Sequence, residues 1–160
     1  TYGLTFNASY KNFDLSIFGT GTAGNEIYNY AFRNDRPYNN SMEYFHKNAW
    51  SADNPGGTMP SALSQLSDIK FWASDACVFD GSFFKIKQIQ LGYSFPEGIL
   101  HKIAVSNLRL YVSLDDYFTF TKYIGMDPET ASAGSQNSIG MDMGSFPTTK
   151  KVLFGINLTF

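Results

Sequence analysis

Four carboxylates are the side chains in this sequence whose type best fits metal chemistry, because Ca²⁺ prefers oxygen ligands. They are Asp115, Asp116, Asp127 and Glu129. Their spacing matches no EF-hand loop. We interpret them as charges at the rim of the fold, with a turn at Pro128.

The other reactive residue types form no recognisable motif. His46 and His101 are far apart in the sequence, and neither has a second ligand at metal-binding spacing. Serine, histidine and aspartate all occur, but without a nucleophile elbow, an HExxH motif or a glycine-rich phosphate loop. Cys77 is the single cysteine, so no internal disulfide can form. We therefore expect neither an enzyme nor a bound metal or cofactor.

Aromatic side chains are the remaining candidates for recognition, and several lie in a long stretch without periodicity. Five of them could contact a ligand or a partner protein: Tyr28, Tyr30, Tyr38, Trp50 and Trp72. Flat rings offer a large contact area at low entropy cost, so they could stack on sugar rings or pack against a partner. The alternative is that they form a small core of the loop itself, because a loop this long must bury something to stay ordered.

The elements that must carry these loops are strands, and the last one is the clearest. From Lys151 to Phe160 apolar residues alternate with mixed ones, which is period two. The apolar side carries Val152, Phe154, Ile156, Leu158 and Phe160. A strand of about 9 to 11 residues with one apolar face suits a membrane barrel. We expect Phe154, Ile156, Leu158 and Phe160 to anchor this strand in the membrane.

Similar alternation predicts five strands and an all-β, antiparallel transmembrane barrel. The strands cover about residues 2–10, 13–20, 82–95, 108–118 and 148–160. The connections alternate between short ones, at Lys11-Asn12 and a helical turn over Glu97 to Asn107, and long ones over about 21–81 and 119–147. This asymmetry is typical of bacterial barrels, whose periplasmic turns are short and whose extracellular loops are long. Five strands cannot close a barrel, so we expect the C-terminal part of a larger one.

Local details refine this prediction. A short helix is expected over Ser41 to Trp50, with Ser41 as its N-cap. Near Lys85 and Lys87 the alternation is less clean, which indicates a bulge or an end outside the membrane. Aromatic residues fall at the predicted periplasmic ends, at Tyr10, Phe13, Tyr93, Phe95 and Phe160. Others cluster towards the predicted outer rim, at Tyr117, Phe118, Phe120 and Tyr123.

Composition agrees with a membrane barrel and excludes other classes. Aromatic residues make up 17% of the chain and charged residues only 16%, whereas soluble proteins are about a quarter charged. The net charge of -2 offers no basic patch for nucleic acid. Two alternatives stay open: a soluble β-sandwich that binds carbohydrate, and a small complete barrel with further strands inside residues 21–81.

Several stretches resemble the C-terminal region of the SusC/RagA-like TonB-dependent outer-membrane transporters. They read YKNFDLSIFGTGTAGNEIYN, DGSFFKIKQIQLGYSFP, SNLRLYVSLDDYFTFTKYIGMDPE and SFPTTKKVLFGINLTF, and they cover roughly two thirds of the chain. Their order and rough spacing are similar to the closing strands of that family. One departure is Asp115-Asp116, where the family more often has an uncharged pair like Gln-Asn.

The resemblance implies a barrel of about 22 strands with a plugged lumen, in the outer membrane of a Gram-negative bacterium. It implies import of oligosaccharides or other large nutrients, peptides included, powered through TonB by parts that lie outside this chain. It also implies a SusD-like surface lipoprotein as a lid. Besides outer-membrane lipid, the barrel-assembly machinery is an expected partner, which would read the C-terminal aromatic Phe160 as a signal.

Overall fold

The computed structural model describes residues 1–30, 43–61, 74–100, 105–132 and 138–160, and these form two compact units. One unit comprises Thr1–Ala23, Phe83–Thr121 and Thr148–Phe160, and the other Gly24–Ser82 and Lys122–Pro147. Among the described residues, no helix is both long and apolar enough to cross a membrane.

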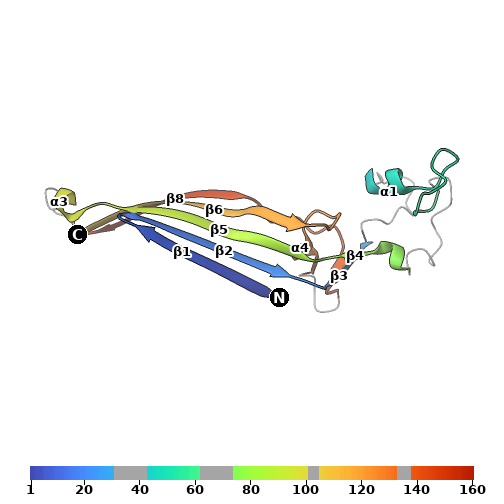
Figure 1. Ribbon diagram of the computed structural model, residues 1–160, viewed down its shortest axis with the longest axis horizontal. Helices are drawn as coiled ribbons and strands as arrows, with labels where there is room; N and C mark the ends of the chain where they lie inside the picture. Colours follow the sequence, from blue (N-terminus) through green and yellow to red (C-terminus); the bar gives the residue numbers. More distant parts are fainter. Residues whose placement is uncertain (31–42, 62–73, 101–104, 133–137) are drawn as a thin grey trace. The chain divides into compact units, whose positions relative to one another are not determined.

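The first unit is a sheet of five strands. They are β1 (Tyr2–Tyr10), β2 (Phe13–Thr22), β5 (Phe83–Ser94), β6 (Asn107–Thr121) and β8 (Lys151–Thr159). Their spatial order is β1-β2-β5-β6-β8, and every neighbouring pair is antiparallel (Figure 1). All five lie where the alternation of the sequence predicts a strand. β1 and β8 are the edges of this sheet.

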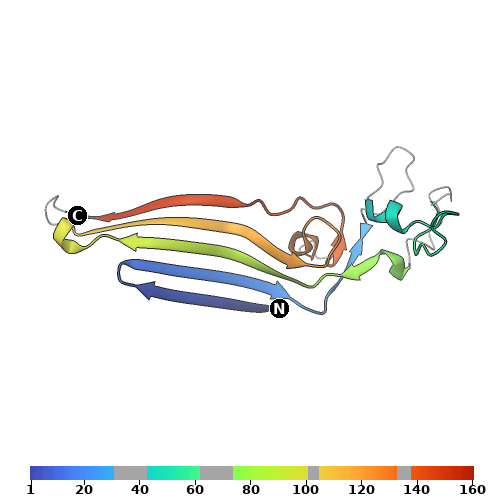
Figure 2. The same cartoon turned by 45° about the horizontal axis from the view of Figure 1, so that its top comes forward.

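The short connections of this sheet lie at one end. β1 and β2 are joined by Lys11 and Asn12, and Lys11 has a φ of 54°, which the tight reversal requires. The connection between β5 and β6 contains α3 (Glu97–Leu100), and β6 begins at Asn107, the last residue of the predicted helical turn. Figure 2 shows the β1–β2 turn, α3 and the C-terminus at the same end of the sheet.

The register gives the sheet one apolar and one polar face, because directly opposite residues share a face. On the apolar face of β8, Phe154 lies opposite Val112 and Ile156 opposite Leu110. Phe154 is 83% exposed and Ile156 68% exposed. The apolar face continues over β6, β5, β2 and β1 with Leu114, Ile89, Leu91, Tyr93, Phe13, Leu15, Ile17, Tyr10, Ala8 and Phe6.

Two bulges interrupt the alternation where the sequence is less clean. The pairing of β5 with β2 passes from Gln88 to Ile86, so Lys87 is an extra residue. The pairing of β5 with β6 passes from Asp115 to Phe118, and Asp116 has a φ of 55°. The predicted bulge near Lys87 is therefore confirmed. It turns Ile86 to the apolar face, where regular alternation would have turned Lys87.

The second unit shows that the long connections over residues 21–81 and 119–147, predicted as loops, contain short strands. It contains a three-stranded sheet of order β4-β3-β7, built from β3 (Glu26–Asn29), β4 (Val78–Asp80) and β7 (Met141–Asp142). β3 is antiparallel to β4 and parallel to β7. Strands of two to four residues are too short to show alternation, which is why the sequence did not reveal them.

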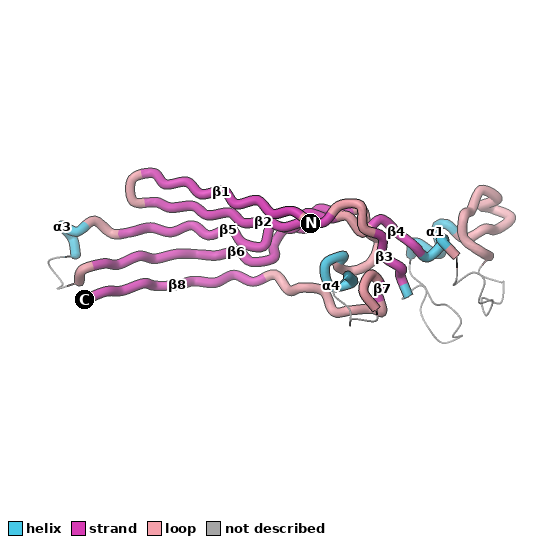
Figure 3. The backbone as a smooth tube through the Cα atoms, turned by 90° about the horizontal axis from the view of Figure 1, so that it is seen from below, coloured by secondary structure: helices cyan, strands magenta, loops and turns pink. Residues whose placement is uncertain are grey.

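Short helices complete the second unit: α1 (Glu43–Asn48), η2 (Asp75–Cys77) and α4 (Pro128–Ser132). α1 lies inside the predicted helix, whose proposed cap Ser41 is outside the described residues. Figure 3 shows the helices and strands along the chain. In the residues that the structure describes, the additional strands form a separate sheet and do not join the long one, so they give no support to a small complete barrel.

Candidate functional site

The polar face of the long sheet carries an ion pair that crosses a strand. Arg109 on β6 donates from Nε to Asp14 Oδ1 on β2 at 2.9 Å, and from Nη2 to Asp14 Oδ2 at 2.5 Å. The two side chains pass over Gly92 of β5. A Cβ on Gly92 would lie 2.5 Å from Asp14 Oδ1, so any larger residue would force the ion pair to move. The pair Asp14 and Arg109 was not predicted, although opposite charges on the polar faces of two strands were a usable signal.

A second glycine on the polar face accommodates an aromatic ring. Tyr111 of β6 lies directly opposite Gly155 of β8, and a Cβ on Gly155 would overlap the tyrosine ring. Arg109 lies 5.2 Å from the centroid of the same ring, within reach of a cation–π contact. Arg109 and Tyr111 are thus held together, each over a glycine of a neighbouring strand.

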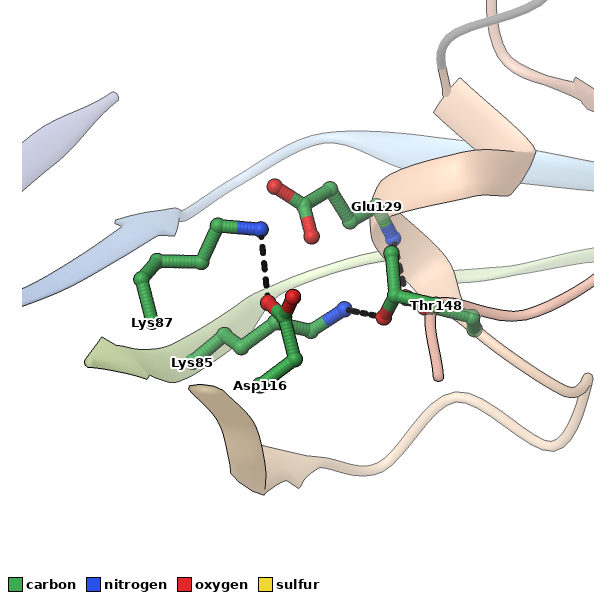
Figure 4. Close-up of polar contacts among 6 residues, drawn as sticks. Lys85, Lys87, Asp116, Glu129 and Thr148 are labelled. Atoms are coloured by element: carbon green, nitrogen blue, oxygen red, sulfur yellow. Dashed lines mark hydrogen bonds and ion pairs between the residues drawn. The ribbon is translucent and has the colours of Figure 1, made fainter. Parts of the chain in front are cut away.

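Charged residues also gather on the long sheet around the two bulges. Lys87 Nζ lies 2.9 Å from Asp116 Oδ1, which joins the two bulged residues (Figure 4). Lys85 is only 1% exposed, and its Nζ donates to Thr148 Oγ1 at 2.7 Å (Figure 4). Asp115 accepts a hydrogen bond from Ser113. The Asp115-Asp116 pair, at which the chain departs from the family pattern, is therefore engaged in contacts with its own sheet.

The apolar face has pairs of aromatic residues at both ends and mainly aliphatic residues between them, apart from Phe6 and Phe154. At the end with the short turns, Tyr93 packs against Phe13 at 4.8 Å and against Phe95 at 5.1 Å between ring centroids. At the other end Tyr2 stacks on Phe84 at 5.9 Å. A shallow apolar depression of about 250 Å³ adjoins the pair Phe13 and Tyr93 and is also lined by Leu91, Gly92, Leu110, Tyr111, Val112 and Phe154. This distribution is typical of a membrane-spanning surface with interfacial girdles.

Tyr123, one of the four aromatic residues predicted towards the outer rim, is buried inside the second unit. It is 6% exposed in the core of the second unit, with Ile27 and Ala131. Its hydroxyl donates to Asp142 at 2.6 Å and accepts from Asn29 at 3.0 Å. Burial, followed by the hydrogen bond to Asp142, raises the pKa of Tyr123. The network ties β3 to β7 and so joins the two long connections of the chain.

Trp50 is the predicted contact residue that the structure exposes most clearly. It is 52% exposed, whereas the neighbouring core is formed by Phe45, Ala49 and Met59. Its amide donates to the carbonyl of Met59 at 2.9 Å. The side chain of Asn54 donates to the Ala49 carbonyl at 3.0 Å. The tryptophan is therefore presented on a braced turn and is not part of the loop core.

The other predicted contact residues differ from Trp50. Tyr28 and Tyr30 are partly buried and face each other, with ring centroids 6.4 Å apart. Tyr38 and Trp72 lie outside the described residues. The four predicted anchors of the last strand, Phe154, Ile156, Leu158 and Phe160, are all exposed.

The candidate metal ligands are occupied by other contacts. Asp127 accepts from the amide of Glu129 at 3.0 Å and so caps α4. Within the described parts of the chain, no three His, Cys, Asp or Glu side chains are grouped so that they could hold a metal ion. His46 lies beside Phe45, and His101 falls outside the described residues. Cys77 is buried, and burial raises the pKa of its thiol.

The whole chain is similar to segments of known TonB-dependent receptors. It is 33% identical to TonB-dependent receptor P3 of Formosa agariphila over 100% of this chain and 16% of that protein. It is 29% identical to TonB-dependent receptor SusC of Bacteroides thetaiotaomicron over 99% of this chain and 15% of that protein. The chain thus spans about a sixth of the curated relatives. No protein-family model matches it.

Solved structures show the same fold. The RagAB peptide importer in its closed-closed state matches 99% of this chain and 17% of the solved chain, with a TM-score of 0.77 and 24% identity. The open-open state gives a TM-score of 0.74 and 23% identity. The sheet is therefore part of a larger antiparallel barrel. From the two-faced sheet and this whole-length similarity, the chain belongs to the SusC/RagA-like TonB-dependent receptors and forms part of their barrel wall.

Proposed function

We propose that the protein of which this chain is a part imports large nutrients across the outer membrane of a Gram-negative bacterium. The observation that carries this proposal is the uncovered apolar face of the long sheet. It extends over all five strands and is bounded by aromatic residues, as a lipid-facing wall requires. A soluble sandwich would have to bury Phe154, which is 83% exposed.

The orientation of the wall follows from its connections. Lys11-Asn12, α3 and the C-terminus share one end of the sheet (Figure 2), and short turns belong at the periplasmic rim. The second unit, built from the two long connections, is then extracellular. The polar face, with Asp14 and Arg109, lines the lumen. The exposed anchors Phe154, Ile156, Leu158 and Phe160 contact lipid, and Phe160 also serves as a signal for the barrel-assembly machinery.

The substrate class is oligosaccharides or peptides. Peptides are supported by the similarity to RagAB, a peptide importer, and oligosaccharides by the resemblance of the strand sequences to the SusC/RagA-like family. A SusD-like surface lipoprotein would act as the lid, and TonB would supply energy through parts of the protein outside this chain. Trp50 is the favoured contact with substrate or lid, because its ring is exposed on a hydrogen-bonded backbone and a flat ring offers a large contact area. Tyr28, Tyr30, Tyr38 and Trp72 are further candidates in the same extracellular segment.

The proposal is tested by deleting the gene and growing the strain on a panel of glycans and of proteins or peptides as sole carbon sources. We expect growth to fail on one class and to be restored by the full-length gene, but not in a strain without TonB. The full-length protein should fractionate with the outer membrane. Normal growth on every large nutrient, or a protein recovered without membranes, would refute the proposal.

A further inference from the structure

Strand β6, which lies between β5 and β8, places two adjacent polar-face side chains over glycines of these two neighbours. On one side Arg109 passes over Gly92 of β5, where an added Cβ would lie 2.7 Å from Arg109 Cζ. On the other side the ring of Tyr111 covers Gly155 of β8 and leaves no room for a Cβ. We call Gly92 and Gly155 the glycine notches.

Apolar and polar alternation alone leaves the register of these strands ambiguous. A slip of one residue exchanges the two faces and is excluded by the cost of turning polar residues to lipid. A slip of two residues keeps every side chain on its own face, because the period is two. It would pair Leu110 with Phe154 or Leu158 in place of Ile156, and all three partners are apolar. Something other than alternation must exclude it.

The glycine notches distinguish the native register from a slip of two. On β8, the polar-face residues two positions from Gly155 are Leu153 and Asn157. On β5, the polar-face residues two positions from Gly92 are Gln90 and Ser94. Each of these has a Cβ that would meet the ring of Tyr111 or the guanidinium of Arg109. Only the observed register places a glycine under each side chain.

We propose that Arg109 and Tyr111, seated in the two glycine notches, set the register of β5, β6 and β8 during assembly of the barrel wall. The ion pair to Asp14 extends the same constraint to β2. In a closed barrel the stagger of the strands is linked to its diameter and tilt. The notches thus determine barrel geometry, and they do so whatever the transported nutrient is.

The test moves one notch and reads the register by disulfide cross-linking of the full-length protein in the outer membrane, with Cys77 and any other native cysteines replaced. Leu110→Cys is paired separately with Ile156→Cys, which reports the native register, and with Phe154→Cys, which reports a slip of two. With both notches intact, we expect the Ile156 link. In the double variant Leu153→Gly with Gly155→Leu, the ring of Tyr111 fits opposite residue 153. The dominant link should then change to Phe154, with about a tenfold loss of the Ile156 link.

A second experiment tests the proposal if the double variant Leu153→Gly with Gly155→Leu, called the moved-notch variant, fails to assemble. Gly155→Leu alone should also lower the yield of folded barrel about tenfold, and adding Tyr111→Ala should restore both the yield and the Ile156 link. An unchanged Ile156 link at full yield in the moved-notch variant would overturn the proposal. So would a Gly155→Leu defect that Tyr111→Ala does not relieve, because the glycine would then be needed for its backbone and not for the ring.

Discussion

Replacing Ile156 with arginine should strongly destabilise the barrel in the membrane. Ile156 is 68% exposed on the apolar face of β8, opposite Leu110. It lies four residues from Phe160. At about 3.3 Å per residue along a strand tilted by about 40°, that is about 10 Å from the rim. The apolar band of such barrels is about 25 Å tall, so Ile156 lies near its middle.

The expected cost follows from this depth. Arginine on the lipid face near the bilayer midplane costs about 2–4 kcal/mol, so the ratio of folded to unfolded protein should fall about 30-fold or more. The assay is urea unfolding of the full-length protein refolded into lipid vesicles. The matched control is Leu153→Arg, in the same strand but on the polar face opposite Ser113. It should cost less than about 1 kcal/mol, because an arginine in the lumen stays in contact with water.

Equal losses for Ile156→Arg and Leu153→Arg would refute the assignment of the faces. A small loss for both would place this part of β8 outside the hydrocarbon layer. Either result would remove the physical basis for treating the sheet as a lipid-facing wall.

Three further predictions concern the second unit. Trp50→Ala should weaken binding of substrate or lid at least tenfold, while the yield of folded barrel, measured by heat-modifiable gel mobility, stays unchanged. Trp50→Phe should retain part of the binding. A loss of barrel assembly in Trp50→Ala would instead show that Trp50 is structural. Tyr123→Phe should destabilise the second unit by about 1–3 kcal/mol, because the substitution removes the hydrogen bond that buried Asp142 accepts. Limited proteolysis of the full-length protein should then show faster cleavage of the long connections. Cys77 should resist maleimide in the folded protein and react in urea, since its thiol is buried with a raised pKa; rapid labelling without urea would contradict its burial.

The interior of the second unit could not be read from the sequence. β3, β4 and β7 are two to four residues long and come from segments around residues 26, 78 and 141. Such short strands form through hydrogen bonding to their neighbouring strands, and their own sequences are too short to show a periodic pattern. The same holds for the aromatic residues: composition could not separate exposed Trp50 from buried Phe45, because both belong to one stretch and differ only in their neighbours.

Alternation in the sequence is enough to predict the five long strands and their apolar face, because a period of two is a local property that each strand displays alone. Which polar residues meet across the sheet depends on how the strands pair. Asp14 and Arg109 are 95 residues apart in the chain, and their pairing depends on Gly92 of the strand between them. The register of β8 likewise rests on a ring of β6 that fits over Gly155. Such contacts arise from strand pairing over long sequence distances, and alternation does not encode them.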